Sequence, residues 1–131
     1  MKIYPTITTT DGRYLEKLEE AERLGLKEVC FFPTCLGIKE REKFYKLLEK
    51  SAIKKIPFVH LRSDMQLWEM DFLVQKYHTE VFNCHPAKVN PLENDLSQYR
   101  RYLFVENSLN FPEEKEINLY AGLCVDFSHL E

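Results

Sequence analysis

The sequence has no apolar run that approaches the roughly 20 residues needed to span a bilayer, and its first residues lack the long apolar region of a secretory signal. These two absences predict a cytoplasmic protein with no membrane partner. In that compartment the four cysteines are expected to be thiols. Cys30 and Cys35 are too far apart for a CxxC redox motif, so we expect all four cysteines to be small buried apolar residues.

An excess of positive charge is also missing. The net charge is −3, and the basic residues are scattered between acidic ones. A nucleic-acid partner is therefore not favoured, although a local positive groove is left open. No repeat, linker or low-complexity segment divides the chain, and its length is that of a single domain covering residues 1–131. The oligomeric state is left open by the sequence.

What the sequence does contain is a regular alternation of short apolar runs and amphipathic segments. The apolar runs, which we predict to be strands, are residues 2–7, 28–32, 56–61, 80–84, 102–105 and 118–127. The predicted helices are residues 13–24, 38–50, one starting at the apparent capping box of residues 63–66, a short one at residues 90–100, and a helical turn at residues 112–116. Strands that alternate with helices indicate an α/β protein with a parallel sheet and right-handed crossovers.

Two architectures fit this alternation, an open doubly wound sheet and a β/α-barrel. Residues 8–12 (TTTDG) are not the glycine-rich phosphate loop that would favour the open sheet. The polar residues gather instead at the carboxyl ends of successive strands, where barrel enzymes have their active sites. We therefore predict a TIM (β/α) barrel. Because a complete barrel needs about 200 residues or more, we expect this one to be truncated after its sixth strand.

Five polar residues lie at these strand ends. His60 ends the third run, His85 follows the fourth, Glu106 ends the fifth, and Asp126 and His129 end the sixth. If Glu106 and Asp126 both point inward, their carboxylates repel each other unless one takes up a proton or a cation joins them. Imidazoles beside them predict a divalent metal, with zinc, manganese or cobalt suiting nitrogen and oxygen ligands. The alternative is a set of hydrogen-bonded polar residues with no ligand.

This set of residues resembles the xylose-isomerase-like barrel superfamily, which includes sugar and sugar-phosphate isomerases and epimerases and the endonuclease IV type of apurinic endonuclease. Glu106 in Val-Glu-Asn-Ser is similar to the metal-binding glutamate that ends the family's fifth strand, and Asp126-Phe-Ser-His129 is similar to its Asp-x-x-His pattern. The resemblance implies that Glu106, Asp126, His85 and His60 bind metal. It further implies that Glu106 and His129 are catalytic, with His129 touching substrate in the isomerases or a further metal in the nuclease.

Other residues near these strand ends are candidates for substrate binding. Arg62 follows the third strand and Lys88 the fourth, and a pair of cations beside a metal suits a phosphate-bearing substrate. The alternative is that both are solvated loop charges. Asn107, next to Glu106, and His129 are also assigned to substrate binding.

The sequence thus predicts a metal-dependent isomerase or epimerase that acts on a small sugar or sugar phosphate. In this reaction a metal polarises a carbonyl and the adjacent hydroxyl, and a carboxylate moves a proton at the carbon between them. Two alternatives stay open. One is a metal-dependent phosphodiesterase of the endonuclease IV kind that acts on abasic DNA. The other is a truncated barrel without catalytic activity.

Overall fold

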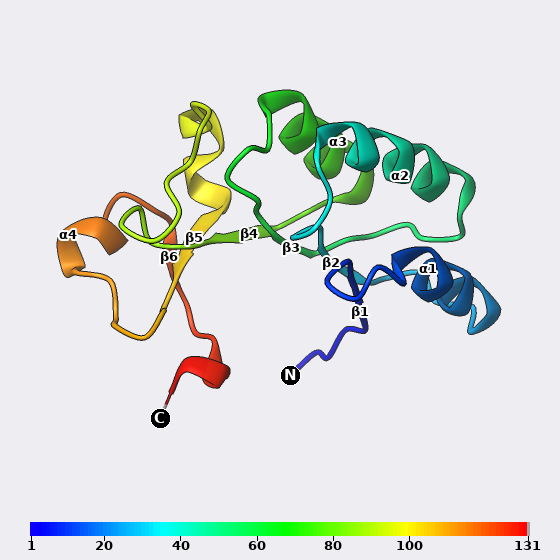
Figure 1. The fold of residues 1–131 in the computed structure, drawn as a ribbon, viewed down its shortest axis with the longest axis horizontal. Coiled ribbons are helices and arrows are strands. Elements are labelled where there is room, and N and C mark those ends of the chain that lie inside the picture. The colour runs from blue at the N-terminus through cyan, green and yellow to red at the C-terminus, as the bar shows by residue number, and fades with distance from the viewer. Residues whose placement is uncertain (131) are drawn as a thin grey trace.

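The computed structural model describes residues 1–130 and alternates parallel strands with helices (Figure 1). The sheet has six strands in the order β1-β2-β3-β4-β5-β6, and every neighbouring pair is parallel. The strands are β1 (Thr6–Thr8), β2 (Cys30–Phe32), β3 (Phe58–His60), β4 (Val81–Cys84), β5 (Leu103–Glu106) and β6 (Gly122–Cys124). The predicted α/β class and sequential strand order are confirmed. Within the described residues β1 and β6 are the two edges of this sheet.

The helices lie between the strands, as the alternation predicts. They are α1 (Tyr14–Arg23), α2 (Ile38–Lys50), α3 (Leu67–Tyr77) and α4 (Glu114–Ile117), with 3-10 turns η1 (Ser97–Tyr102) and η2 (Phe127–His129). Helix α2 has the predicted bounds because its start is fixed locally, by a hydrogen bond from the Gly37 N–H to Glu40 Oε2 at 2.9 Å. Of the residues described, no helix combines the length and apolar character of a membrane span.

Two predicted helix starts are wrong. Helix α3 begins at Leu67 rather than near Ser63, and the segment before η1 is not helical. The reason is a tertiary contact between the two loops. The Glu93 N–H donates to the Ser63 carbonyl at 2.9 Å, and the Ser63 hydroxyl donates to the Glu93 carboxylate at 3.2 Å. The groups that were expected to cap helices therefore join the loops after β3 and β4.

Successive residues of each strand face opposite sides of the sheet, and this separates the core from the site. On the side of the helices, Phe31, Val59 and Phe82 are fully buried, and Phe31 stacks on Phe44 of α2 with ring centroids 4.9 Å apart. Burying a side chain of this size stabilises the fold by about 1.5–3 kcal/mol. Figure 1 shows α2 and α3 on one side of the sheet and both chain termini on the other. The polar strand ends belong to this second side.

A buried ion pair joins α2 to α3. The guanidinium of Arg41 contacts both carboxylate oxygens of Glu69, at 2.7 and 2.9 Å, and neither side chain is exposed. The Tyr45 hydroxyl donates to the same carboxylate at 2.8 Å. These bonds satisfy two charges inside the core, where an unpaired charge would be strongly destabilising.

The cysteines are all free thiols, as predicted. Cys30 and Cys84 are buried in the sheet, which agrees with their assignment as small apolar residues. Cys35 is exposed and Cys124 is half-buried, so for these two the prediction of burial is wrong. Cys35 lies in the loop between β2 and α2, where its backbone N–H is bound by the Thr9 hydroxyl and its side chain is left outside the core.

Candidate metal centre

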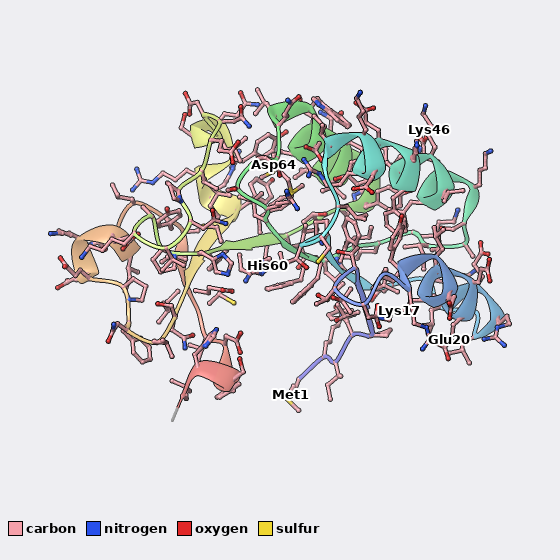
Figure 2. The ribbon with its side chains drawn as sticks, in the orientation of Figure 1. Met1, Lys17, Glu20, Lys46, His60 and Asp64 are labelled. Atoms are coloured by element: carbon pink, nitrogen blue, oxygen red, sulfur yellow. The ribbon has the colours of Figure 1, made fainter. Side chains whose placement is uncertain are left out.

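Three side chains from neighbouring strands meet on the side of the sheet that faces away from the core. They are His60 at the end of β3, His85 just after β4 and Glu106 at the end of β5. One ligand atom from each lies within 4.8 Å of the other two. In Figure 2, His60 lies beside β3 and β4 on the side of the sheet away from α2 and α3. Strands β3, β4 and β5 run parallel, so their carboxyl ends lie at the same edge of the sheet. The pairing of these strands places His60, His85 and Glu106 side by side.

Glu106 is the centre of this cluster. Its Oε1 atom lies 3.0 Å from Nε2 of His85, and its Oε2 atom lies 3.7 Å from Nδ1 of His60. The Glu106 side chain is almost fully buried, while that of His85 is about one-third exposed. The cluster is therefore enclosed on the sheet side and open to solvent past His85.

Asn83 completes the cluster, and sequence analysis missed it. Its Nδ2 atom lies 2.9 Å from Nδ1 of His60 and also donates to Oε2 of Glu106. An acceptor role for Nδ1 places the proton of neutral His60 on the other ring nitrogen. Asn83 is paired with His60 across the β3–β4 ladder and faces the same side as His85 two residues later. That strand period was the available signal.

The charges in this cluster shift one another's pKa. Burial lowers the pKa of His60, and this outweighs the opposite effect of Glu106. The hydrogen bond to Glu106 raises the pKa of His85 against the effect of burial. Burial also raises the pKa of Glu106, but the hydrogen bond from His85 and the nearby imidazoles hold it below its usual value. In the metal-free chain the carboxylate is thus ionised and has partners.

Asp126 and His129 line the same hollow but do not belong to the cluster within 4.8 Å. Asp126 Oδ1 accepts the Ser128 N–H at 2.8 Å, which caps the short turn η2 and lowers the pKa of this carboxyl. Its other oxygen lies 3.7 Å from Nε2 of His129. The structure therefore places the predicted aspartate and histidine in the lining of the same hollow but outside the cluster.

The three remaining candidates lie outside the lining of the hollow. Asn107 is fully buried, and its amide bonds both the N–H and the carbonyl of Asp126, at 2.6 and 2.9 Å. Arg62 donates to Asp64 and to the Thr34 carbonyl, each at 2.8 Å. Lys88 is exposed and pairs with Glu113 at 3.2 Å. Asn107 thus holds the end of β6, while the two cations are bound by loop residues.

The hollow itself has a volume of about 540 Å³. Its walls combine aromatic rings with the polar cluster, and among the described residues no lysine or arginine lines it. It is lined by Phe32, Thr34, Phe58, His60, Asn83, His85, Glu106, Cys124, Val125, Asp126, Phe127 and His129. A hollow of this size suits a small molecule with apolar faces and a few polar groups.

The donor set and its spacing fit a divalent metal. Two imidazoles and one carboxylate are the protein ligands of many catalytic zinc sites. Ligands about 2.1 Å from one ion stand roughly 3.0 to 3.4 Å apart. The 3.0 Å between Nε2 of His85 and Oε1 of Glu106 has this spacing, and the 3.7 Å between Nδ1 of His60 and the other carboxylate oxygen is somewhat longer. The hydrogen bonds within the cluster also satisfy Glu106 without an ion, so the geometry suits both states.

Comparison of the chain with models of known protein families, with curated proteins and with solved structures finds no match.

Proposed function

We propose that this chain forms consecutive units of a β/α-barrel enzyme and that its hollow binds a divalent metal for the isomerisation or epimerisation of a small sugar. The observation that supports this most is the meeting of His60, His85 and Glu106 within 4.8 Å, beside a hollow with aromatic walls. Zinc, manganese and cobalt suit these donors.

Each group has a role in this proposal. A metal held by His60, His85 and Glu106 supplies polarisation of a substrate carbonyl and its neighbouring hydroxyl. Asp126 lines the same hollow and has a lowered pKa, so it is ionised at neutral pH and accepts the proton from the hydroxyl-bearing carbon next to the carbonyl. His129, whose Nε2 lies 3.7 Å from that carboxylate, contacts the substrate, and the protonated Asp126 returns the proton to the substrate carbon.

The lining favours an unphosphorylated substrate. The two cations expected to bind phosphate, Arg62 and Lys88, are held by Asp64 and Glu113 and lie outside the hollow. The rings of Phe32 and Phe58 instead offer apolar walls for the C–H faces of a sugar.

A second candidate is a metal-dependent phosphodiesterase of the endonuclease IV kind. The observation in its favour is that both imidazoles lie against Glu106, since a His₂Glu donor set also activates water for hydrolysis. The net charge of −3 and the absence of lysine and arginine among the described lining residues weigh against a polyanionic substrate.

The test has two stages, both on the 131-residue chain. Calorimetric titration with Mn²⁺, Co²⁺ and Zn²⁺ measures metal binding, with Glu106→Gln as the variant that removes the central ligand. His78→Asn is the matched control, because His78 lies far from the cluster at the end of α3 in a left-handed conformation that asparagine also adopts.

The metal-loaded chain is then incubated with aldoses and ketoses of three to six carbons in D₂O, and with a duplex that carries an abasic site. Deuterium incorporation next to the sugar carbonyl, abolished in Glu106→Gln and retained in His78→Asn, supports the isomerase. Cleavage of the abasic strand with no sugar exchange would replace it by the phosphodiesterase. Metal binding with neither reaction would indicate a barrel fragment without catalytic activity.

A further inference from the structure

Asn83 is in an unusual position within the cluster. The residue is only 3% exposed, and its amide nitrogen lies between Nδ1 of His60 and Oε2 of Glu106. Its other amide atom, Oδ1, is buried and has no hydrogen-bond partner among residues 1–130, and it is the only such side-chain atom in this part of the chain. A buried acceptor without a partner destabilises the protein, so the arrangement calls for an explanation.

Turning the amide over does not remove the problem in the metal-free chain. It would put Oδ1 against the carboxylate of Glu106, so that two acceptors would face each other beside Nδ1 of His60. Among residues 1–130, the amide nitrogen lies within hydrogen-bond distance of both atoms and donates to Oε2 of Glu106, which favours its present position. Oδ1 is left without a partner because the nitrogen end of the amide faces Glu106.

A bound cation would reverse the preferred orientation of the Asn83 amide, so that its oxygen rather than its nitrogen faces His60 and Glu106. The two atoms beside Nδ2 are an imidazole nitrogen of His60, Nδ1, and a carboxylate oxygen of Glu106, Oε2, and both atom types can ligate a divalent metal. Once a metal binds them, an N–H pointing at it is unfavourable and a carbonyl oxygen is favourable. A half-turn about the Cβ–Cγ bond exchanges the two ends of the amide within nearly the same volume.

We propose that Asn83 is a further metal ligand, through Oδ1, and that its amide holds the site in the metal-free chain and rotates when the ion binds. This inference rests on the metal centre of the proposed function and adds a ligand to it. The 2.9 Å between the amide position and Nδ1 of His60 is close to the roughly 3.0 Å that separates neighbouring ligands of one ion.

The added ligand affects the choice of metal. Two imidazole nitrogens, a carboxylate and a neutral amide oxygen make a mixed donor set, and carbonyl oxygens suit Mn²⁺ better than they suit Zn²⁺. Removal of Asn83 should therefore weaken the binding of Mn²⁺ by a larger factor than that of Zn²⁺.

Two variants distinguish a ligand from a residue that merely positions its neighbours. Asn83→Leu removes both the donor and the oxygen, while Asn83→Asp removes the donor and keeps an oxygen. If Asn83 only positions His60 and Glu106, both variants weaken metal binding. If its oxygen is a ligand, the leucine variant loses affinity and the aspartate variant binds at least as tightly as the wild type. Asn90→Asp is the control for added charge, because Asn90 is exposed and lies outside the hollow.

The experiment titrates the 131-residue chain and these variants with Co²⁺ and Mn²⁺ alone. It follows the visible absorption of Co²⁺ and the displacement of Co²⁺ by Mn²⁺. We expect Asn83→Leu to lose at least about 10-fold in affinity, because removal of a mere hydrogen-bond partner of a metal ligand already costs about that much. Asn83→Asp should keep the absorption bands, and Asn90→Asp should bind as the wild type does.

Unchanged Co²⁺ affinity in Asn83→Leu, or equal losses in both Asn83 variants, would overturn the proposal while leaving the metal centre in place. A wild type that binds neither ion would refute the metal centre as well.

A measurement on the unmutated chain covers the case in which a variant does not fold. In the metal-free state, NMR should show contacts between the Asn83 NH₂ protons and the ring of His60. Addition of Zn²⁺ should abolish these contacts and shift the side-chain nitrogen. If the contacts persist in the zinc-loaded chain, the amide has not turned and the proposal is wrong.

Discussion

The guanidinium of Arg41 and the carboxylate of Glu69 form two hydrogen bonds in the core, at 2.7 and 2.9 Å, with no exposed surface on either side chain. The Arg41 guanidinium also reaches the Leu36 carbonyl at 2.8 Å and Asp64 at 3.1 Å. A single arginine therefore connects α2, α3 and the loops after β2 and β3. Its loss should affect the whole helical layer.

Substitution of one partner of this pair should be severe. Arg41→Met leaves the charge of Glu69 buried without its main partner, and we expect the free energy of unfolding to fall by about 3–5 kcal/mol. The double variant Arg41→Met/Glu69→Leu should be more stable than Arg41→Met alone, because neither charge is then left unpaired. Urea denaturation of the two variants measures the difference. If the double variant is the less stable of the two, hydrogen bonding rather than charge burial dominates here.

Replacement of Glu106 should weaken both the metal site and the metal-free fold. If the buried carboxylate of Glu106 had no partners, removal of its charge would stabilise the metal-free protein. His85 and Asn83 bind this carboxylate, so we expect the opposite. Glu106→Gln turns an amide N–H₂ toward Asn83 or His85, and we expect a loss of about 1.5–3 kcal/mol in the presence of EDTA, the contribution of hydrogen bonds to a charged group. Thermal unfolding in EDTA and in Zn²⁺ checks this, with a larger loss expected in Zn²⁺ because bound metal stabilises only the wild type. A gain in EDTA would show that Glu106 is an unpaired charge in the native chain.

The two imidazoles of the cluster should titrate on opposite sides of the usual histidine pKa of 6.5. In EDTA, NMR of the ring protons should place the pKa of His85 above this value and that of His60 below it. The reverse order would mean that Glu106 pairs mainly with His60.

Stability follows the same shifts. The contribution of His85 is complete below 6.5 and is lost as the pH rises through its raised pKa, while that of Glu106 is present above 4.5 and is lost as the pH falls through its lowered pKa. Buried neutral His60 lowers stability as the pH falls below 6.5, because the unfolded chain takes up a proton there more readily. His60→Asn should therefore be less sensitive to pH than the wild type between pH 4.5 and 6.5, as measured by urea denaturation along a pH series.

Asp126→Asn separates the two roles available to that carboxylate. If Asp126 accepts a proton from substrate, the variant should bind Co²⁺ within about threefold of the wild type and lose at least about 100-fold in turnover, the contribution typical of a positioned base. Calorimetry and the D₂O exchange assay measure the two effects. A tenfold or greater loss of Co²⁺ affinity would instead make Asp126 a metal ligand, as the sequence analysis predicts.

The sequence predicted those parts of the fold and site that depend on local patterns. The strand order, the bounds of α2 and the placement of His60, His85 and Glu106 on one side all follow from chain periodicity and from strands running in the same direction.

The features that sequence reasoning missed depend on contacts between distant segments. Ser63 and Glu93 each stand in a segment with the spacing of a helix capping box. In the structure these two residues instead bind each other and join their loops. Arg41 and Glu69 give no pairing signal, because they lie on different helices. The strand period places Asn83 on the same side as His85, but its contacts with His60 and Glu106 across the sheet, which define its role, have no signal in the sequence.

The side chain of Asn107 bonds the N–H and the carbonyl of Asp126 as a neighbouring strand would, although β6 has already ended at Cys124. Asp126 is thereby attached to Asn107, the residue that follows directly after Glu106 and the end of β5. The two carboxylates belong to one mechanical unit, so a displacement of the end of β5 carries both of them together. Substitutions along β6 should consequently change the mobility of η2 far more than the placement of Asp126 relative to Glu106.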